Sequence, residues 1–339
     1  MEHAYDPAAL EAEFRQAAPG EARMRAIRQA ISEAEQAGDT DTALHFHHAL
    51  IKESVFSGDR YQALIDFPQY LTLVHSSPET EQAWAHDSLW LFKWIVEAST
   101  EFYQIEKKQI LAWFAEFRRS LARQGYSLKP FYEKRAIFFS YCDRARLRMD
   151  YEDFLSAQDD EMCDGRADEL NTVVRWELEF GSREKGLRTA AQIINGKMFS
   201  DEIPATTYGY LLADALRHGE AEQAAMHAEC LRQLSDGSRF RLEQIGQLLR
   251  YDAGTDPARG YAFYLKNRHL RENLRNPLLC FRFDCGAAAI LEAAAAEQLG
   301  DAEALRAAAA ACRSQAQTAA EKFDARNGSD FFASALRGI

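Results

Sequence analysis

The sequence predicts an all-α protein in which antiparallel helix hairpins stack as an α-solenoid. Hydrophobic residues recur at helical spacing along almost the whole chain, and no stretch shows the period of two that is typical of a β-strand. Only 18 glycines and 8 prolines occur in 339 residues, among many Ala, Leu, Glu, Gln and Arg. The segments between the helical patterns are short, and short connections favour antiparallel neighbouring helices.

Most of the expected helices have recognisable boundaries. Pro7 suits the first turn of the first helix, Gly38 ends the second, and Asp41 can cap the third. Gly58 and Asp59 separate the third helix from the fourth. The helices are expected, in order, at 7–17, 22–36, 40–56, 60–74, 79–99, 105–124, 130–148, 167–180, 183–195, 204–218, 220–234, 238–251, 257–273, 277–299, 301–325 and 329–336.

A repeated offset links several of these hairpins. A glycine ends one helix and a small residue follows five positions later, as in the pairs Gly38 and Ala43, Gly181 and Gly186, and Gly219 and Ala224. The glycines at positions 181, 219 and 254 lie 38 and 35 residues apart. A small residue at this point lets the second helix approach the first closely. The pattern resembles the tetratricopeptide repeat (TPR), whose period is about 34 residues.

The TPR resemblance is clearest around Gly219 and Gly38 and partial around Gly181, where Glu177 stands at a position that is usually aromatic. The closing proline of the TPR pattern is missing from these three units. The residues that match around Gly219 are Tyr208, Leu211 and Leu212 on the first helix and Ala224, Ala228 and Leu231 on the second. The resemblance covers roughly two-thirds of the chain and implies a superhelix with a concave groove.

Two lobes are expected. The aromatic-rich stretch 79–150 lacks the glycine turn, so longer helices are expected there, within an N-terminal lobe over 1–157. The C-terminal lobe, 167–339, is expected to hold TPR-like repeats and to end in alanine-rich capping helices, through which self-association is an option. The acidic, glycine-bearing segment 157–166 is the expected junction.

Composition excludes several classes of function. A net charge of −12 argues against nucleic-acid binding, which needs a basic face. No apolar run approaches the roughly 20 residues that span a bilayer, and the N-terminus has no signal-peptide pattern, so no membrane partner is expected. Six cysteines without a CxxC pair predict a reduced, cytoplasmic protein.

The charge is distributed unevenly along the chain. Residues 101–150 carry eleven Lys and Arg against six Asp and Glu, whereas residues 151–170 carry eight acids against one Arg. A basic strip inside a superhelical groove would attract an acidic peptide, because arginine makes bidentate contacts with carboxylates. The alternative is a solvated face neutralised by the acidic segment 152–169. The candidate binding residues from this stretch are Arg119, Arg123, Lys134, Arg144 and Arg148.

Two further candidates, Asn171 and Arg175, come from the TPR resemblance. They occupy first-helix positions that face the groove in TPR proteins, where asparagine and basic residues of peptide-binding members hold carboxylates. The alternative is two polar residues on an exposed helix face. No catalytic motif is recognised, and the metal-like spacing of His45 and His48 has no partner nearby in sequence to complete a site, so no metal or cofactor is expected.

The sequence therefore predicts a TPR-like scaffold or adaptor that binds a protein or peptide partner in its concave groove. An acidic partner would fit the basic residues expected there. An enzyme is less favoured. The alternative is a helical-repeat ligand sensor or enzyme with an aromatic-lined pocket in residues 79–150, formed around Trp90, Trp94 or Trp113.

Overall fold

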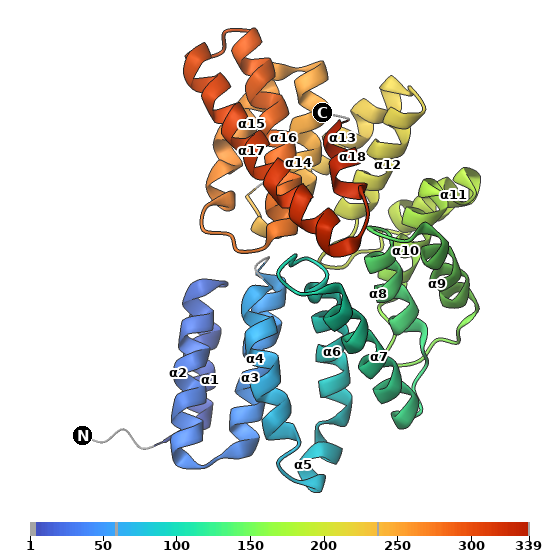
Figure 1. Cartoon of the computed structure of the whole chain (residues 1–339). Coiled ribbons are helices and arrows are strands. Elements are labelled where there is room, and N and C mark those ends of the chain that lie inside the picture. The colour runs from blue at the N-terminus through green and yellow to red at the C-terminus, as the bar shows by residue number, and fades with distance from the viewer. Residues whose placement is uncertain (1–4, 58–59, 236, 338–339) are drawn as a thin grey trace.

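The predicted all-α class is confirmed by the computed structural model, which describes residues 5–57, 60–235 and 237–337. Over these ranges the chain forms eighteen α-helices and two short 3-10 helices, and no strand (Figure 1). The predicted turn at Gly58 and Asp59 lies outside the described residues. Within the described ranges, no helix is both long and apolar enough to span a bilayer.

The helices pack mainly in sequence-adjacent pairs, such as α2 with α3, α8 with α9, α10 with α11 and α12 with α13. The first nine are α1 (Pro7–Gln16), α2 (Glu21–Ala37), α3 (Thr40–Phe56), α4 (Tyr61–Val74), α5 (Pro78–Ala83), α6 (Ala85–Ser99), α7 (Lys107–Gln124), α8 (Lys129–Phe139) and α9 (Arg144–Ser156). The remaining helices are α10 (Arg166–Glu179), α11 (Arg183–Asn195), α12 (Ala205–Arg217), α13 (Ala221–Ser235), η1 (Arg239–Arg241), α14 (Leu242–Thr255), α15 (Pro257–Asn267), η2 (Arg268–Arg271), α16 (Pro277–Ala296), α17 (Ala302–Asn327) and α18 (Phe331–Arg337).

Two of the expected long helices are each divided in two. The stretch 79–99 is interrupted at Trp84, between α5 and α6. The stretch 130–148 is interrupted between α8 and α9, where Asp143 accepts a hydrogen bond from the backbone N–H of Arg146 and so caps α9. The aromatic region is therefore built from shorter helices than the sequence predicts.

Contacts between hairpins join residues about one repeat apart. Arg60 pairs with Glu97, Thr172 donates to Glu133, and Asn171 donates to Thr206, at sequence separations of 37, 39 and 35 residues. Alternate helices also pack together, in the runs α4, α6, α8 and α10, α12, α14, α16. The bond between Thr172 on α10 and Glu133 on α8 connects the two runs. These six helices from α6 to α16 are called the inner helices below.

The C-terminal helices return to the middle of the chain. In Figure 1 the end of α17 reaches the middle of the molecule. Arg326 at the end of α17 donates to the carbonyl oxygens of Thr100 and Phe102, which follow α6. Ser329 donates to the carbonyl oxygen of Tyr141, whose ring packs against Phe332. The hydrophobic cores also cross the expected lobe boundary, since one cluster joins residues of α3 to α9 with Trp176 of α10. The inner helices thereby surround a central space.

Candidate functional site

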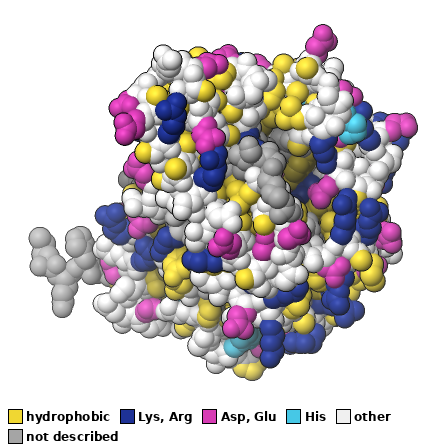
Figure 2. Space-filling model, turned by 45° about the horizontal axis from the view of Figure 1, so that its top comes forward, with side chains coloured by type: hydrophobic (Ala, Val, Ile, Leu, Met, Phe, Trp, Pro, Cys, Tyr) yellow, Lys and Arg dark blue, Asp and Glu magenta, His cyan; other side chains and the backbone are white. Residues whose placement is uncertain are grey.

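The inner helices, together with loops between them, line a partly open cavity of about 390 Å³ that contains many charged side chains. Figure 2 shows one face of the molecule, hollowed near its centre, with acidic and basic side chains around the hollow. The basic residues that line the cavity are Arg60, Lys134, Arg175, Arg241 and Arg282. The acidic residues that line it are Glu97, Glu101, Glu133, Asp164, Asp168, Asp201, Glu202 and Glu243.

One stripe of α10 faces this cavity. Asp168, Asn171, Thr172 and Arg175 all line it, and their spacing of three, four and seven residues places them on one face of a helix. The other side of α10 is buried: Leu170 and Val174 pack into the core, and Glu177 is held there by Tyr151. Burial of that face orients the polar stripe toward the centre of the molecule.

Lys134 lies at the centre of a buried ion network. Its Nζ atom is 2.7 Å from Asp164 Oδ2, 3.2 Å from Glu97 Oε2 and 3.3 Å from Glu133 Oε2. Burial opposes the charge on Lys134, but these carboxylates outweigh it and raise the pKa of the ammonium well above its ordinary value. Burial likewise opposes ionisation of Glu97, but Lys134 and Arg60 outweigh that effect and hold the pKa of Glu97 at about 2. The charge of Lys134 is therefore already paired with carboxylates of the protein itself.

Glu133 gives this network a pH dependence. Burial raises the pKa of Glu133 to about 7, although Lys134 acts in the opposite direction. A carboxyl group whose pKa is raised by folding stabilises the folded state below its ordinary pKa, and that contribution is lost as the pH rises toward the folded value. The stability of the protein relative to its Glu133→Gln variant should therefore fall between pH 4.5 and 7, by on the order of 1–3 kcal/mol. Urea unfolding of both proteins at pH 5 and pH 7.5 measures this, and a constant difference between them would contradict it.

Arg175 differs from the other cavity cations because it has no ion pair and no hydrogen bond within the described ranges. Its guanidinium is half-buried and lies 4.1 Å from the centre of the Trp176 ring and 5.9 Å from that of Tyr210. By contrast, Arg60 is held by Glu97 and Glu101 at 2.7 and 2.9 Å. The other two cavity arginines are also engaged, Arg282 by Glu243 and Arg241 by backbone carbonyl oxygens.

Asn171 is buried and already used to join two helices. Its amide donates to Thr206 Oγ1 at 2.9 Å and accepts from Thr207 Oγ1 at 2.7 Å. Thr206 and Thr207 belong to α12, so Asn171 fixes the position of α12 against α10. It lies in the cavity wall as the TPR resemblance implies, and its amide is committed to the protein.

The other four candidates lie on the outer surface. Arg123 and Arg144 are exposed, Arg119 pairs with Glu116, and Arg148 covers the ring of Phe180. None of the four lines the cavity. The structure thus brings Lys134, Asn171 and Arg175 together and separates the other four from them.

The acidic segment neutralises part of the basic stretch, as the alternative interpretation expected. Lys129 pairs with Asp159 and with Glu169, the latter at 2.9 Å, and Lys134 pairs with Asp164.

Several cavity residues escaped the sequence reasoning. Arg60, Glu97 and Glu202 come from three separate segments and are brought together only by the stacking of hairpins. Asp168 could have been found, because it precedes Arg175 by two helical turns on the same face.

No family model, curated protein or solved structure matches this chain. The function has to be inferred from the residues themselves.

The aromatic residues of 79–150 divide between core and cavity. Phe114, Phe117 and Phe138 are completely or almost completely buried in one hydrophobic cluster. Trp90 and Trp94 line the cavity, and their rings meet edge to face.

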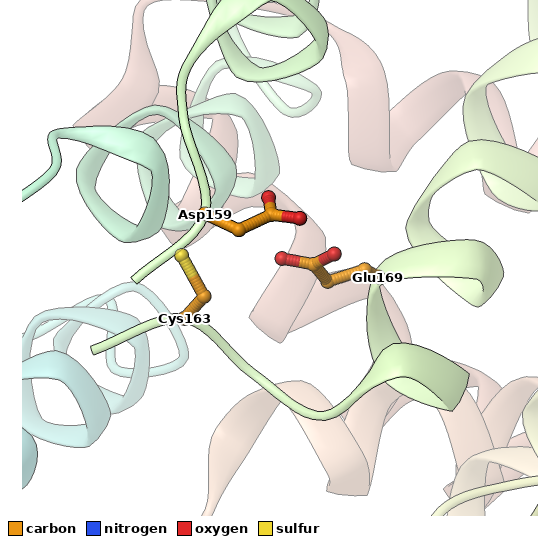
Figure 3. A group of neighbouring side chains, drawn as sticks. All are labelled: Asp159, Cys163 and Glu169. Carbon is orange, nitrogen blue, oxygen red and sulfur yellow. The ribbon is translucent and has the colours of Figure 1, made fainter. Parts of the chain in front are cut away.

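A second cluster, outside the cavity, has ligand types that metals prefer. Asp159, Cys163 and Glu169 place one ligand atom each within 4.8 Å of one another (Figure 3). The ammonium of Lys129, however, contacts both carboxylates. Burial also raises the pKa of Cys163 to about 11, which keeps it a neutral thiol near neutral pH. Lys129 therefore supplies the positive charge that a metal ion would supply.

Proposed function

We propose that this chain is a TPR-like binding protein whose central cavity accepts a carboxylate group of a peptide. Arg175 carries the proposal, because it is a half-buried residue in the cavity wall whose guanidinium has no carboxylate within ion-pair distance among the described residues. Removing a cation from water without pairing it costs free energy. A ligand carboxylate would recover that cost through short, charge-assisted hydrogen bonds.

The architecture supports a superhelix of TPR type. Hydrogen bonds join residues one repeat apart, as described for Arg60 and Glu97. The small residues of the offset pattern lie at close helix contacts, since a Cβ atom on Gly186 would come within 2.7 Å of the Leu178 side chain.

The size of the cavity favours a short ligand. A volume of about 390 Å³ lies near the lower end of the range typical of small-ligand sites. A folded partner would not enter such a space. A few residues of peptide would fit, with apolar side chains against Trp90 and Trp94.

The Arg175→Gln variant tests the proposal. A pool of mixed-sequence tripeptides is titrated into the full-length protein while the fluorescence of the cavity tryptophans is recorded. We expect the substitution to weaken apparent affinity by about 10- to 100-fold, because a hydrogen-bonded charge pair contributes about 1.5–3 kcal/mol. Arg119→Gln, which removes an exposed arginine on the outer surface, is the matched control and should bind as the unaltered protein does.

Equal affinity of the Arg175→Gln variant, or no binding of the pool at millimolar concentration, would refute a peptide carboxylate site. If small carboxylic acids bound and the tripeptides did not, the ligand-sensor alternative would be selected, since Trp90 and Trp94 line the same cavity.

A further inference from the structure

The polar stripe of α10 carries opposite charges at its two ends. Asp168 lies in the first turn of the helix and Arg175 lies seven residues later, which corresponds to about 10 Å along the helix axis. Between them, Asn171 and Thr172 are hydrogen-bonded to neighbouring helices. A ligand lying along α10 would therefore meet a carboxylate at one end and a guanidinium at the other.

At the acidic end, three of the eight cavity carboxylates lack a close counter-ion within the described part of the chain: Asp168, Glu202 and the exposed Asp201. Asp168 accepts a hydrogen bond from Ser200 Oγ at 2.8 Å and has no cation within ion-pair distance. The nearest cation to Glu202 is Arg60, at 3.9 Å, and that guanidinium is already held by two other carboxylates. The paired carboxylates of the same wall are Glu97, Glu101, Glu133, Asp164 and Glu243.

At the basic end, Arg175 is accompanied by a second donor without a partner. Trp176 has no exposed surface, and its indole Nε1 has no acceptor among the described residues. Buried donors of this kind are normally paired, and an unpaired one costs free energy. Trp176 lines the same cavity and lies directly beneath the Arg175 guanidinium. The two neighbouring side chains are thus donors without an acceptor among the described residues, and Arg175 is the one whose guanidinium is partly accessible.

We infer that the cavity recognises a dipolar ligand, a short peptide whose free amino terminus is held by Asp168 and Glu202 while its carboxylate is held by Arg175. The two unpaired ends of the wall complement the two charged ends of such a molecule. This inference rests on the proposed function. It adds that the site also binds the amino-terminal ammonium group of the peptide. A peptide with both termini free is a small diffusible molecule rather than a segment of a folded partner.

The test uses the tripeptide pool in three forms, with free termini, with acetylated amino termini and with amidated carboxyl termini. The rise in Tm of the full-length protein reports binding of each form. We expect each blocked form to bind at least about tenfold more weakly than the free form, since each loses one charged contact. Glu202→Gln and Asp168→Asn should weaken binding of the free pool and leave binding of the acetylated pool unchanged.

Glu222→Gln, on an exposed position of α13 outside the cavity wall, is the control and should change binding of neither the free nor the acetylated pool. Glu202 is 44% exposed at its side chain, so its amide variant is expected to fold even if Asp168→Asn does not. If acetylation had no effect while amidation weakened binding, the dipolar ligand would be ruled out and the carboxylate site would stand. If amidation and Arg175→Gln both had no effect, the carboxylate site would fall and the dipolar ligand with it.

Discussion

Replacing Gly286 with alanine is expected to lower the free energy of unfolding by about 3 kcal/mol. Helices α14 and α16 pack closely where Gly246 and Gly286 meet. A Cβ atom on Gly286 would lie 2.2 Å from the carbonyl oxygen of Gly246 and 2.8 Å from its Cα atom. Because both are backbone atoms, the helices must separate to admit it. Urea unfolding followed by circular dichroism measures the loss.

The control for Gly286 is Gly254→Ala, also at a helical glycine. Gly254 lies in α14, and a Cβ atom there would meet no atom within 4 Å. Alanine is a better helix former than glycine by about 0.8–1 kcal/mol, so this variant should gain stability. Gly286→Ala is thus expected to lower the free energy of unfolding, and Gly254→Ala to raise it. If Gly286→Ala were as stable as Gly254→Ala, the close approach of α14 and α16 would be wrong.

The contact between α14 and α16 also positions two side chains of the cavity wall. Helix α14 carries Glu243 to the cavity wall and α16 carries its partner Arg282. Separating these helices would move both side chains, so Gly286→Ala should also weaken ligand binding.

Local signals were sufficient to predict most of the helices. The third helix runs from Thr40 to Phe56 as predicted, but its cap is Asp39, two residues before the predicted Asp41. The helix over Arg183–Asn195 has the predicted bounds, with Ser182 as its cap. Where capping residues and glycines delimit a helix, its first and last residues can be predicted from the sequence.

The aromatic stretch was predicted less well, for a physical reason. Aromatic residues are apolar on any face, so a helix break such as that after Phe139 does not interrupt the hydrophobic pattern. The cap at Asp143 was the available local signal for it. The contact of α17 with the segment after α6 had no local signal, since Arg326 and Thr100 are 226 residues apart.

The candidate site was predictable only in part. Arg175 was found because the TPR resemblance implies a concave face at its position, and among the described cavity cations it is the one without an ion pair or hydrogen bond. Arg144 was chosen from the density of basic residues along the chain, which does not tell an inner helix face from an outer one. Lys134 lies in the wall, but its partners Asp164 and Glu97 are 30 and 37 residues away. Only hairpin stacking reveals that its charge is already neutralised.

Replacing Asp164 with asparagine is expected to cost about 3–5 kcal/mol of unfolding free energy, because it leaves a buried ammonium without a counter-ion. The two oxygens of Asp164 each lie 2.7 Å from a lysine, one from Lys93 and one from Lys134. Lys134 would keep Glu97 and Glu133 as partners, whereas Lys93 would keep, among the described residues, the carbonyl oxygen of Met162 and the face of Trp90 but no carboxylate within ion-pair distance. Urea unfolding at pH 7 measures the loss.

Asp159→Asn is the matched control from the same segment, since Asp159 also pairs with a lysine but is 67% exposed. An exposed pair contributes about 0–1 kcal/mol, so a small effect is expected. Adding Lys93→Met to Asp164→Asn should recover much of the lost stability, because the stranded charge is then removed together with its partner. No recovery in the double variant would show that Asp164 acts through something other than Lys93.

The pH dependence of the Asp164→Asn variant separates a stranded charge from simple loss of packing. Burial already lowers the pKa of Lys93 below its ordinary 10.5, and Asp164 opposes that shift. Without Asp164 the pKa of Lys93 falls further, so the folded variant binds its proton more weakly than the unfolded chain does. Stability is then lost as the pH falls below 10.5. The deficit of the variant relative to the unaltered protein should therefore be larger at pH 6 than at pH 9, whereas a packing defect would cost the same at both.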